Sequence, residues 1–250
     1  MRYRLVVQYE GSGYAGWQVQ ARGRTVQGEL ERALAAVTQE QVRVLAAGRT
    51  DAGVHASGQV ASFTLKKPWL PEVLARALNA KTPADIAVVY ADIVPDDFHP
   101  RRWALSRTYT YRIWNHGVAS PFWRRYAWHV ARPLDLGAMR EAAAKVCGEH
   151  DFSSFRAAGC EAAHPVRCIF ESTVSQQDNL VTYRIEANGF LRHMVRNLVG
   201  TFVEVGLGKR TPEDVELLLA ARNRNLAGPT APAHGLCLTA VKYSDPLARP

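Results

Sequence analysis

Strand-like and helix-like segments follow one another along this chain without the strict alternation of a βα repeat. Residues Arg2 to Tyr9 alternate apolar and polar side chains, as a strand of a half-buried sheet does. Residues 169–175 and 180–187 predict a hairpin that turns at Asp178-Asn179. Because a hairpin pairs its strands antiparallel, we predict an α+β fold, with mixed, largely antiparallel sheets flanked by helices.

The remaining periodic segments divide into further strands and helices. Strands are predicted at 42–46, 59–65, 86–91, 106–114 and 236–243, and helices at 26–38, 71–79, 136–147, 190–205 and after residue 211. Thr25 is predicted to cap the first helix, and Pro71 to open the second. At 250 residues the chain can form two compact halves, each with its own core. We expect an N-terminal half over 1–115 and a C-terminal half over 116–250, in a pseudo-duplicated architecture.

The chain is basic, and most of its positive charge comes from arginine. The formal net charge is +8, and 25 of the 31 basic residues are arginines. Arginine matches phosphate geometry and stacks on bases, so a nucleic acid is the expected partner.

No apolar run approaches the roughly 18 residues of a membrane span, and residues 1–5 lack the apolar core of a signal peptide. The four cysteines do not form a disulfide framework, so we expect a cytoplasmic protein.

Residues 11–16 spell the GxGxxG pattern of dinucleotide-binding folds. In those folds a helix opens at the glycines, and an acidic residue follows about 20 residues later at a strand end. Here the helix is expected to start only near Thr25, and the acids at that distance, Glu29 and Glu31, lie inside it. We therefore expect no nucleotide cofactor.

Two other arrangements of polar residues imitate functional sites. Cys147 with His150 and Cys160 with His164 have zinc-like spacing, but Cys147 ends a predicted helix that would bury its thiol. We therefore expect no metal. Asp51, His55 and Ser57 suggest a hydrolase triad, yet three members of one short loop rarely converge.

The segment 47–56 places a single carboxylate, Asp51, between Gly48 and Gly53. The glycines permit unusual backbone angles on both sides of the acid. In an extended loop Arg49 and Asp51 point the same way, which sets a cation beside the acid. The residues alone allow both a reactive carboxylate and a solvated turn with a surface ion pair.

Five segments resemble, in their order along the chain, those of one enzyme family. They are Ala47-Gly48-Arg49-Thr50-Asp51-Ala52-Gly53-Val54-His55-Ala56, Tyr9 to Gln20, Phe98 to Arg101 with Arg107 to Tyr111, Gly189 to Asn197, and Ala231 to Leu236. Together they span nearly the whole chain and are similar to the segments of the tRNA pseudouridine synthase A family. His234 stands where many members of that family have an acid.

The resemblance implies an activity, a substrate and a set of site residues. It implies a pseudouridine synthase fold and isomerisation of uridine in the tRNA anticodon arm, at positions 38 to 40, by a homodimer without a cofactor. Carried over to this chain, the catalytic residue is Asp51, and the substrate-binding residues are Tyr109, Arg196 and Leu236.

The chemistry of the implied reaction explains why such residues are needed. The N1–C1′ bond breaks, the base turns, and a C5–C1′ bond forms, so the sugar passes through an electron-poor state that a carboxylate can stabilise. Asp51 can attack C1′ or assist the loss of a sugar proton, and the sequence leaves both routes open. Burial would raise the pKa of Asp51, so a buried guanidinium is expected to keep it ionised. Arg196 is the candidate, on a row with Arg192 and Gly200 at i+4 spacing.

The other implied residues have roles of their own. Tyr109 offers a ring for stacking on uracil and a hydroxyl that could help to remove the C5 proton, and Leu236 a dry wall against water. Arg49 could fill the space that the flipped base leaves or grip its phosphate. Arginines that could contact the tRNA backbone are Arg101, Arg102, Arg107, Arg124 and Arg125. The alternative function is a non-catalytic RNA-binding protein with an RRM-like sheet, which gives no reason for a lone Asp between glycines.

Overall fold

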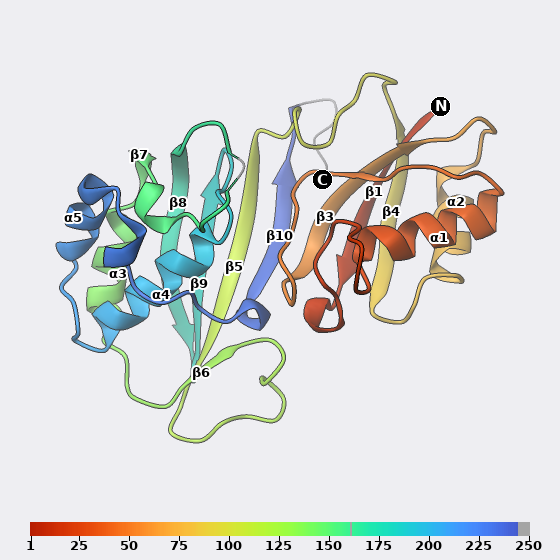
Figure 1. Ribbon diagram of the computed structural model, residues 1–250. Coiled ribbons are helices and arrows are strands. Elements are labelled where there is room, and N and C mark those ends of the chain that lie inside the picture. The colour runs from red at the N-terminus through yellow and green to blue at the C-terminus, as the bar shows by residue number, and fades with distance from the viewer. Residues whose placement is uncertain (161, 245–250) are drawn as a thin grey trace. The chain divides into compact units, whose positions relative to one another are not determined.

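The computed structural model describes residues 1–160 and 162–244, and the chain divides into two compact units (Figure 1). The first unit comprises residues 1–105 and the chain from Cys237 onward, and the second comprises residues 106–236. Strands and helices are mixed, and most strand pairs are antiparallel, so the predicted α+β class is confirmed. The assignment of halves to 1–115 and 116–250 stays a prediction.

The first unit is a sheet with two helices. Its strands are β1 (Arg2–Tyr9), β2 (Leu45–Ala46), β3 (His55–Thr64), β4 (Ile86–Val94) and β10 (Leu236–Lys242), and its helices are α1 (Val26–Thr38) and α2 (Pro71–Asn79). The strand order is β4-β1-β3-β10, with β2 paired to β3. Strand β10 runs parallel to β3, whereas the other pairs in this unit are antiparallel.

The alternating pattern of β1 decides which of its faces is buried. Tyr3, Leu5 and Val7 have no exposed surface and point to one side of the strand. Leu30 and Leu34 of α1 are equally buried, one turn apart on that helix. The side chain of Thr25 accepts a hydrogen bond from the N–H of Gly28, so the predicted cap is confirmed.

The second unit also has a path of four strands, β5-β9-β8-β7. Its strands are β5 (Ser106–Asn115), β6 (Trp128–Val130), β7 (Gly148–Asp151), β8 (Val166–Gln177) and β9 (Leu180–Ala187), and its helices are α3 (Leu136–Ala144), α4 (Met194–Gly206) and α5 (Asp214–Ala221). Helices α3 and α4 pack against each other. The rings of Tyr183 in β9 and Phe202 in α4 lie 5.3 Å apart, which joins α4 to the sheet.

Several predicted boundaries in the second unit were wrong for local reasons. Helix α4 begins at Met194 and not at residue 190, because His193 has φ +61 and interrupts the helical backbone. Arg192 therefore lies outside the helix that carries Arg196. Helix α3 ends at Ala144, and Cys147 is exposed, not buried as expected. The short strands β6 and β7 were not predicted, since three or four residues carry too little periodicity.

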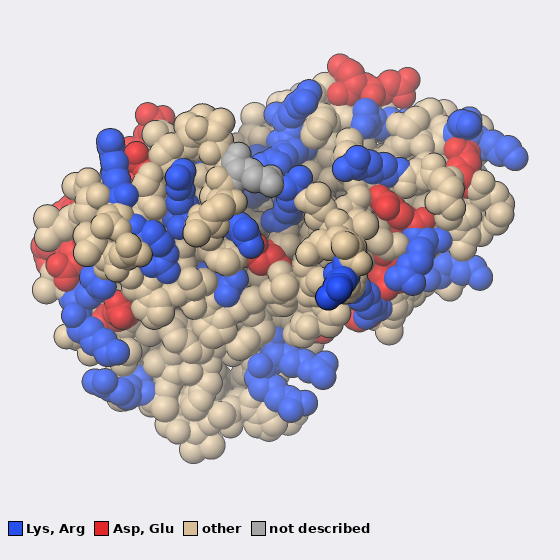
Figure 2. Space-filling view, in the orientation of Figure 1, with Lys and Arg blue, Asp and Glu red and all other residues tan. Residues whose placement is uncertain are grey.

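Lys and Arg side chains are spread widely over the face of the molecule in Figure 2, whereas Asp and Glu form fewer groups.

Among residues 1–160 and 162–244, no helix combines the length and apolar character that crossing a membrane requires.

Candidate active site

Asp51 is the first residue of a tight turn. The N–H of Val54 donates to the carbonyl oxygen of Asp51 at 3.1 Å, which closes a four-residue turn. Gly53, the third residue of the turn, has φ +78, an angle that glycine adopts without strain. The side chain of Asp51 is half-buried. The backbone of this turn therefore requires a glycine at position 53, two residues after the acid.

A second segment, which follows β1, packs directly on this turn. The N–H of Trp17 donates to the carbonyl of Thr50 at 3.0 Å, and the N–H of Gly53 donates to the carbonyl of Tyr14 at 3.3 Å. Gly16 has φ +103, and a Cβ on it would lie 2.7 Å from the carbonyl oxygen of Thr50. Only glycine allows both this backbone angle and this approach. Gly16 thus lets the two segments meet at Asp51.

Gly11 makes the same kind of approach on the other side of the turn. A Cβ on Gly11 would lie 2.0 Å from the carbonyl oxygen of Val54. The N–H of Gly11 donates to Nδ1 of His55 at 2.9 Å. Nδ1 also lies 3.5 Å from a carboxylate oxygen of Glu10. In the shorter of these contacts, Nδ1 of His55 is the hydrogen-bond acceptor.

These contacts explain the glycine pattern of residues 11–16. Helix α1 opens only at Val26, as expected from the sequence, and a short 3-10 turn occupies Gly11–Gly13. Gly11 and Gly16 give room to the Asp51 turn, whereas the nearest atom to a Cβ on Gly13 is a side-chain nitrogen 3.8 Å away. The pattern therefore serves a contact between two loops.

Buried polar groups from β1 and β3 hold the residues before Asp51. The hydroxyl groups of Tyr9 and Thr50 lie 2.8 Å apart and are buried. The amide of Gln59 donates to the carbonyl of Gly48 at 2.7 Å. Burial raises the pKa of the Tyr9 phenol, so it remains a neutral hydrogen-bonding group. The sheet thus fixes the backbone on the N-terminal side of the carboxylate.

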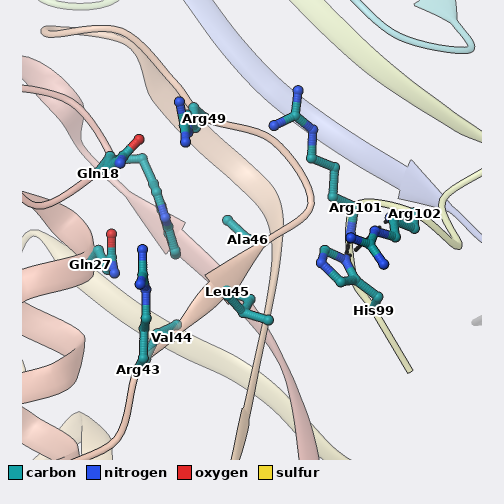
Figure 3. A pocket seen from close by; sticks show the side chains of 11 residues that line it. Gln18, Gln27, Arg43, Val44, Leu45, Ala46, Arg49, His99, Arg101 and Arg102 are labelled. Atoms are coloured by element: carbon teal, nitrogen blue, oxygen red, sulfur yellow. Dashed lines mark hydrogen bonds between the residues drawn. The ribbon is translucent and has the colours of Figure 1, made fainter. Parts of the chain in front are cut away.

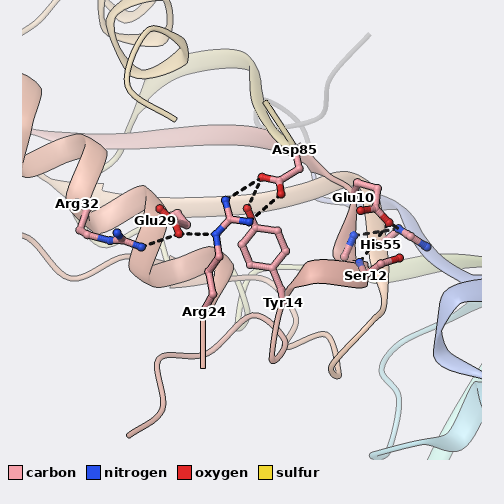
Figure 4. A network of polar contacts seen from close by, with 9 residues as sticks. Glu10, Ser12, Tyr14, Arg24, Glu29, Arg32, His55 and Asp85 are labelled. Atoms are coloured by element: carbon pink, nitrogen blue, oxygen red, sulfur yellow. Dashed lines mark hydrogen bonds and ion pairs between the residues drawn. The ribbon is translucent and has the colours of Figure 1, made fainter. Parts of the chain in front are cut away.

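An ionic network anchors the segment that packs on the turn (Figure 4). The guanidinium of Arg24 bonds Asp85 at 2.8 and 3.2 Å and Glu29 at 2.7 Å, and it lies 4.5 Å from the ring centre of Tyr14. The hydroxyl of Tyr14 also donates to Asp85. Burial raises the pKa of Asp85, but the hydrogen bonds from Tyr14 and Arg24 outweigh it and hold this pKa below its usual range.

Arg49 lines a pocket of about 550 Å³ in the first unit, which we call the arginine pocket (Figure 3). Its side chains come from five places in the chain: the loop before α1, α1 itself, the segment up to Ala46, the Asp51 loop, and the segment after β4. The charged or ionisable side chains that line it are Arg43, Arg49, His99, Arg101 and Arg102.

In the second unit, Tyr109 lies on β5, opposite Ile185 of β9. Only 7% of its surface is exposed, and its ring meets the ring of Phe190 edge-on at 5.1 Å. Phe190 comes from the segment that leads into α4. Tyr109 is therefore a rigid, packed aromatic group.

The segment before Leu236 is clamped by two residues of the second unit. Nε of Arg196 donates to the carbonyl of Ala231 at 2.7 Å, and the hydroxyl of Tyr111 donates to the carbonyl of Pro232 at 2.8 Å. A Cβ on Gly235 would lie 2.5 Å from the Tyr111 ring, so this segment approaches the ring closely. Leu236 follows at once and is 5% exposed. Arg196, on α4, thus helps to fix the backbone segment that leads into Leu236.

Two polar residues considered as functional candidates, Arg107 and His150, contact backbone carbonyl groups of the protein. Arg107, a candidate for tRNA contact, is 8% exposed and donates to the carbonyl of Asn188 at 3.0 Å. Nε2 of His150 lies 2.9 Å from the carbonyl of Cys147. Within the part of the chain that the structure describes, no three His, Cys, Asp or Glu side chains are grouped so that they could hold a metal ion.

Sequence reasoning singled out Arg49 and Asp51, which the first unit places on one loop, and Tyr109, Arg196 and Leu236, which lie on or border the second unit. It did not predict that other residues hold these groups in place, namely Tyr9, Thr50, Gln59 and Tyr111. Buried tyrosines and threonines look like ordinary core residues in a sequence, so only the spacing of Gly11 and Gly16 carried a signal.

Comparisons with known proteins agree on one family. Residues 5–101 and 142–244 match a family model described as tRNA pseudouridine synthase. The chain is 50% identical to tRNA pseudouridine synthase A of Moorella thermoacetica over 96% of this chain and 98% of that protein. It is 48% identical to the enzyme of that name from Myxococcus xanthus, over 98% of this chain and 92% of that protein. The solved archaeal box H/ACA Nop10-Cbf5 complex shares 10% identity and a TM-score of 0.39 over 98% of this chain and 49% of the other, a likeness too weak to carry an argument.

The contact between the two loops predicts the effect of a single methyl group. Gly16→Ala adds a Cβ 2.7 Å from the Thr50 carbonyl oxygen at φ +103, so one loop must move. We expect the free energy of unfolding in urea to fall by roughly 2 kcal/mol or more. Gly13→Ala is the matched control and should change it by less than about 0.5 kcal/mol. Equal stability of the two variants would contradict the contact.

Proposed function

Since this chain belongs to the tRNA pseudouridine synthase A family and is a tRNA pseudouridine synthase, we propose that it isomerises uridines 38 to 40 of the tRNA anticodon arm, with the Asp51 carboxylate acting at the ribose. The observation that carries the proposal is the rigid turn on which Asp51 lies, in a segment that resembles the catalytic segment of that family.

The reaction sets the chemical requirements. The N1–C1′ bond of uridine breaks and a C5–C1′ bond forms, while the hydrogen on C5 is lost and N1 gains one. The C5 proton leaves to the surroundings and N1 takes one up, while no electrons and no chemical group pass to another molecule, so we expect no nucleotide cofactor and no metal. The sugar becomes electron-poor when its bond to N1 breaks, and a carboxylate close to C1′ stabilises that state.

Asp51 is suited to this role because its position is fixed before the substrate arrives. Its turn is closed by the Val54 N–H, and the Trp17 N–H holds the preceding carbonyl. Half-burial reduces the water around the carboxylate without removing it from reach. Attack on C1′ and assistance in the loss of a sugar proton both require a carboxylate held in this way.

The remaining site residues are proposed to bind the target nucleotide. The packed ring of Tyr109 would stack on uracil, and Leu236 would exclude water, which would otherwise hydrolyse the activated sugar. Arg196, which is half-buried, would supply positive charge to the bound nucleotide. Arg49, which is exposed beside the Asp51 turn, would fill the space that the flipped base leaves or grip its phosphate.

The alternative of a non-catalytic RNA-binding protein with an RRM-like sheet is set aside. Family membership gives the chain an enzymatic activity, and a binding module needs no carboxylate on a glycine-dependent turn. The halves 1–115 and 116–250 remain our proposed functional division, with the catalytic loop in the first.

We also propose that the enzyme acts as a symmetric homodimer. A tRNA arm is a large polyanion, and a net charge of +8 per chain favours a basic surface that two subunits share. One chain has a mass of 27.7 kDa, and light scattering at assay concentration should give twice this mass. A fully active monomer would contradict this proposal.

The catalytic roles predict loss of turnover without loss of binding. Asp51→Asn should abolish pseudouridine formation, and Arg196→Ala should lower it by at least about 100-fold, since each removes charge needed at the reacting sugar. Both should retain most of their affinity for tRNA, because the phosphate contacts remain. We would measure single-turnover rates with excess enzyme on unmodified tRNA, in EDTA and without nucleotide, and map the modified positions.

Matched variants separate these roles from general effects of charge. Asp97→Asn and Arg124→Ala change exposed residues and should keep the wild-type rate once tRNA is bound. Turnover by Asp51→Asn above the trace expected from deamidation would overturn the assignment of Asp51. If Arg196→Ala loses affinity and keeps its saturated rate, Arg196 is a phosphate contact instead.

A further inference from the structure

The arginine pocket has a composition that the proposed site residues do not explain. Of the residues that the structure describes, four arginines line it, and no aspartate or glutamate does. Figure 3 shows Arg43 on one side of it and Arg101 and Arg102 on the other, with Arg49 above. Its volume of about 550 Å³ is in the range of sites that hold one small ligand.

One wall of the pocket is built by hydrogen bonds that fix it in place. The side chain of Gln27 accepts from the N–H of Val19 at 3.1 Å and donates to Glu31 at 2.8 Å. Glu31 in turn accepts from the N–H of Val44 at 2.9 Å, next to Arg43. The backbone of Arg43 is therefore held by α1, and the Glu31 carboxylate is engaged by these donors.

The opposite wall is fixed by His99. Its Nδ1 accepts hydrogen bonds from the backbone N–H groups of Arg101 and Arg102, at 3.2 and 3.4 Å. Burial lowers the pKa of His99, and the positive charges of Arg102, Arg2 and Arg101 lower it further. The ring therefore stays neutral and keeps Nδ1 as an acceptor. The charges of these arginines make the electrostatic potential at the pocket positive.

The segments that carry Arg49 and His99 lie side by side because residues next to them pack in the same buried hydrophobic cluster. Ala47, two residues before Arg49, and Phe98, which precedes His99, belong to the same buried cluster as Tyr243. The hydroxyl of Tyr243 donates to the carbonyl of Pro100 at 2.7 Å. The fold itself thus brings guanidinium groups from distant parts of the chain to one place, against their mutual repulsion.

We propose that the arginine pocket binds a phosphodiester of the substrate tRNA next to the target uridine, with Arg43 and Arg102 as its phosphate contacts. Guanidinium groups bind phosphate oxygens through paired N–H donors, and a phosphate removes the repulsion among the arginines. Arg49 lines the pocket two residues before Asp51, which fits a nucleotide adjacent to the reacting one. The inference rests on the proposed function, because it assigns part of the same substrate.

The experiment measures how the affinity for unmodified tRNA depends on salt. Arg43→Ala and Arg102→Ala should each lower the affinity about tenfold and reduce the slope of log K against log salt by about 0.7 to 0.9. Arg102→Lys retains the charge and should retain the wild-type slope. Arg76→Ala, on α2 and outside the pocket, removes the same charge and should change neither quantity. Melting curves confirm that each variant folds.

The outcomes separate the inference from the proposed function. If the wild-type protein forms no pseudouridine in tRNA, the proposed function fails, whatever the slopes are. If it does, and the slopes of Arg43→Ala and Arg102→Ala equal that of Arg76→Ala, the pocket is not a phosphate site of the tRNA. Tight binding of uridine monophosphate that Arg102→Ala abolishes, with an unchanged tRNA slope, would assign the pocket to a free nucleotide and overturn the inference.

Discussion

The structure of the first unit depends on two backbone segments that approach each other more closely than any side chain would allow. Gly11 and Gly16 carry no Cβ at the points where the segment after β1 meets the carbonyl oxygens of Val54 and Thr50. The hydrogen bonds from Trp17 and Gly53 hold the two segments together. This contact fixes a turn with Asp51 at its start, and the pocket that Arg49 lines is built beside it.

The second unit uses the same principle with different groups. Gly235 lies against the ring of Tyr111, and the hydroxyl of that ring and the guanidinium of Arg196 hold the carbonyls of Pro232 and Ala231. In both units, residues proposed to contact the nucleotide are supported by hydrogen bonds of buried tyrosines, Tyr9 in the first unit and Tyr111 in the second. A catalyst that acts through position and charge needs its groups fixed before the substrate binds.

The sequence predicted what depends on local pattern and missed what depends on distant contacts. The bounds of β1, α1, α2 and β9 were predicted correctly, because periodicity and caps are local signals. The start of α4 was wrong because nothing in the sequence indicates a positive φ at His193. Asp51 was proposed as the catalytic residue by resemblance, whereas the hydrogen bond between Tyr9 and Thr50 joins residues 41 positions apart and has no local signal.

The central claim, that the first unit positions Asp51 through buried groups behind its turn, is tested most directly by a double-mutant cycle on single-turnover rate. Tyr9→Phe and Thr50→Val each remove one partner of the 2.8 Å hydrogen bond. The account predicts that each lowers the rate about tenfold, and that the double variant is no slower than either, since both act through one interaction. Wild-type rates in the single variants, or losses that multiply in the double variant, would contradict it.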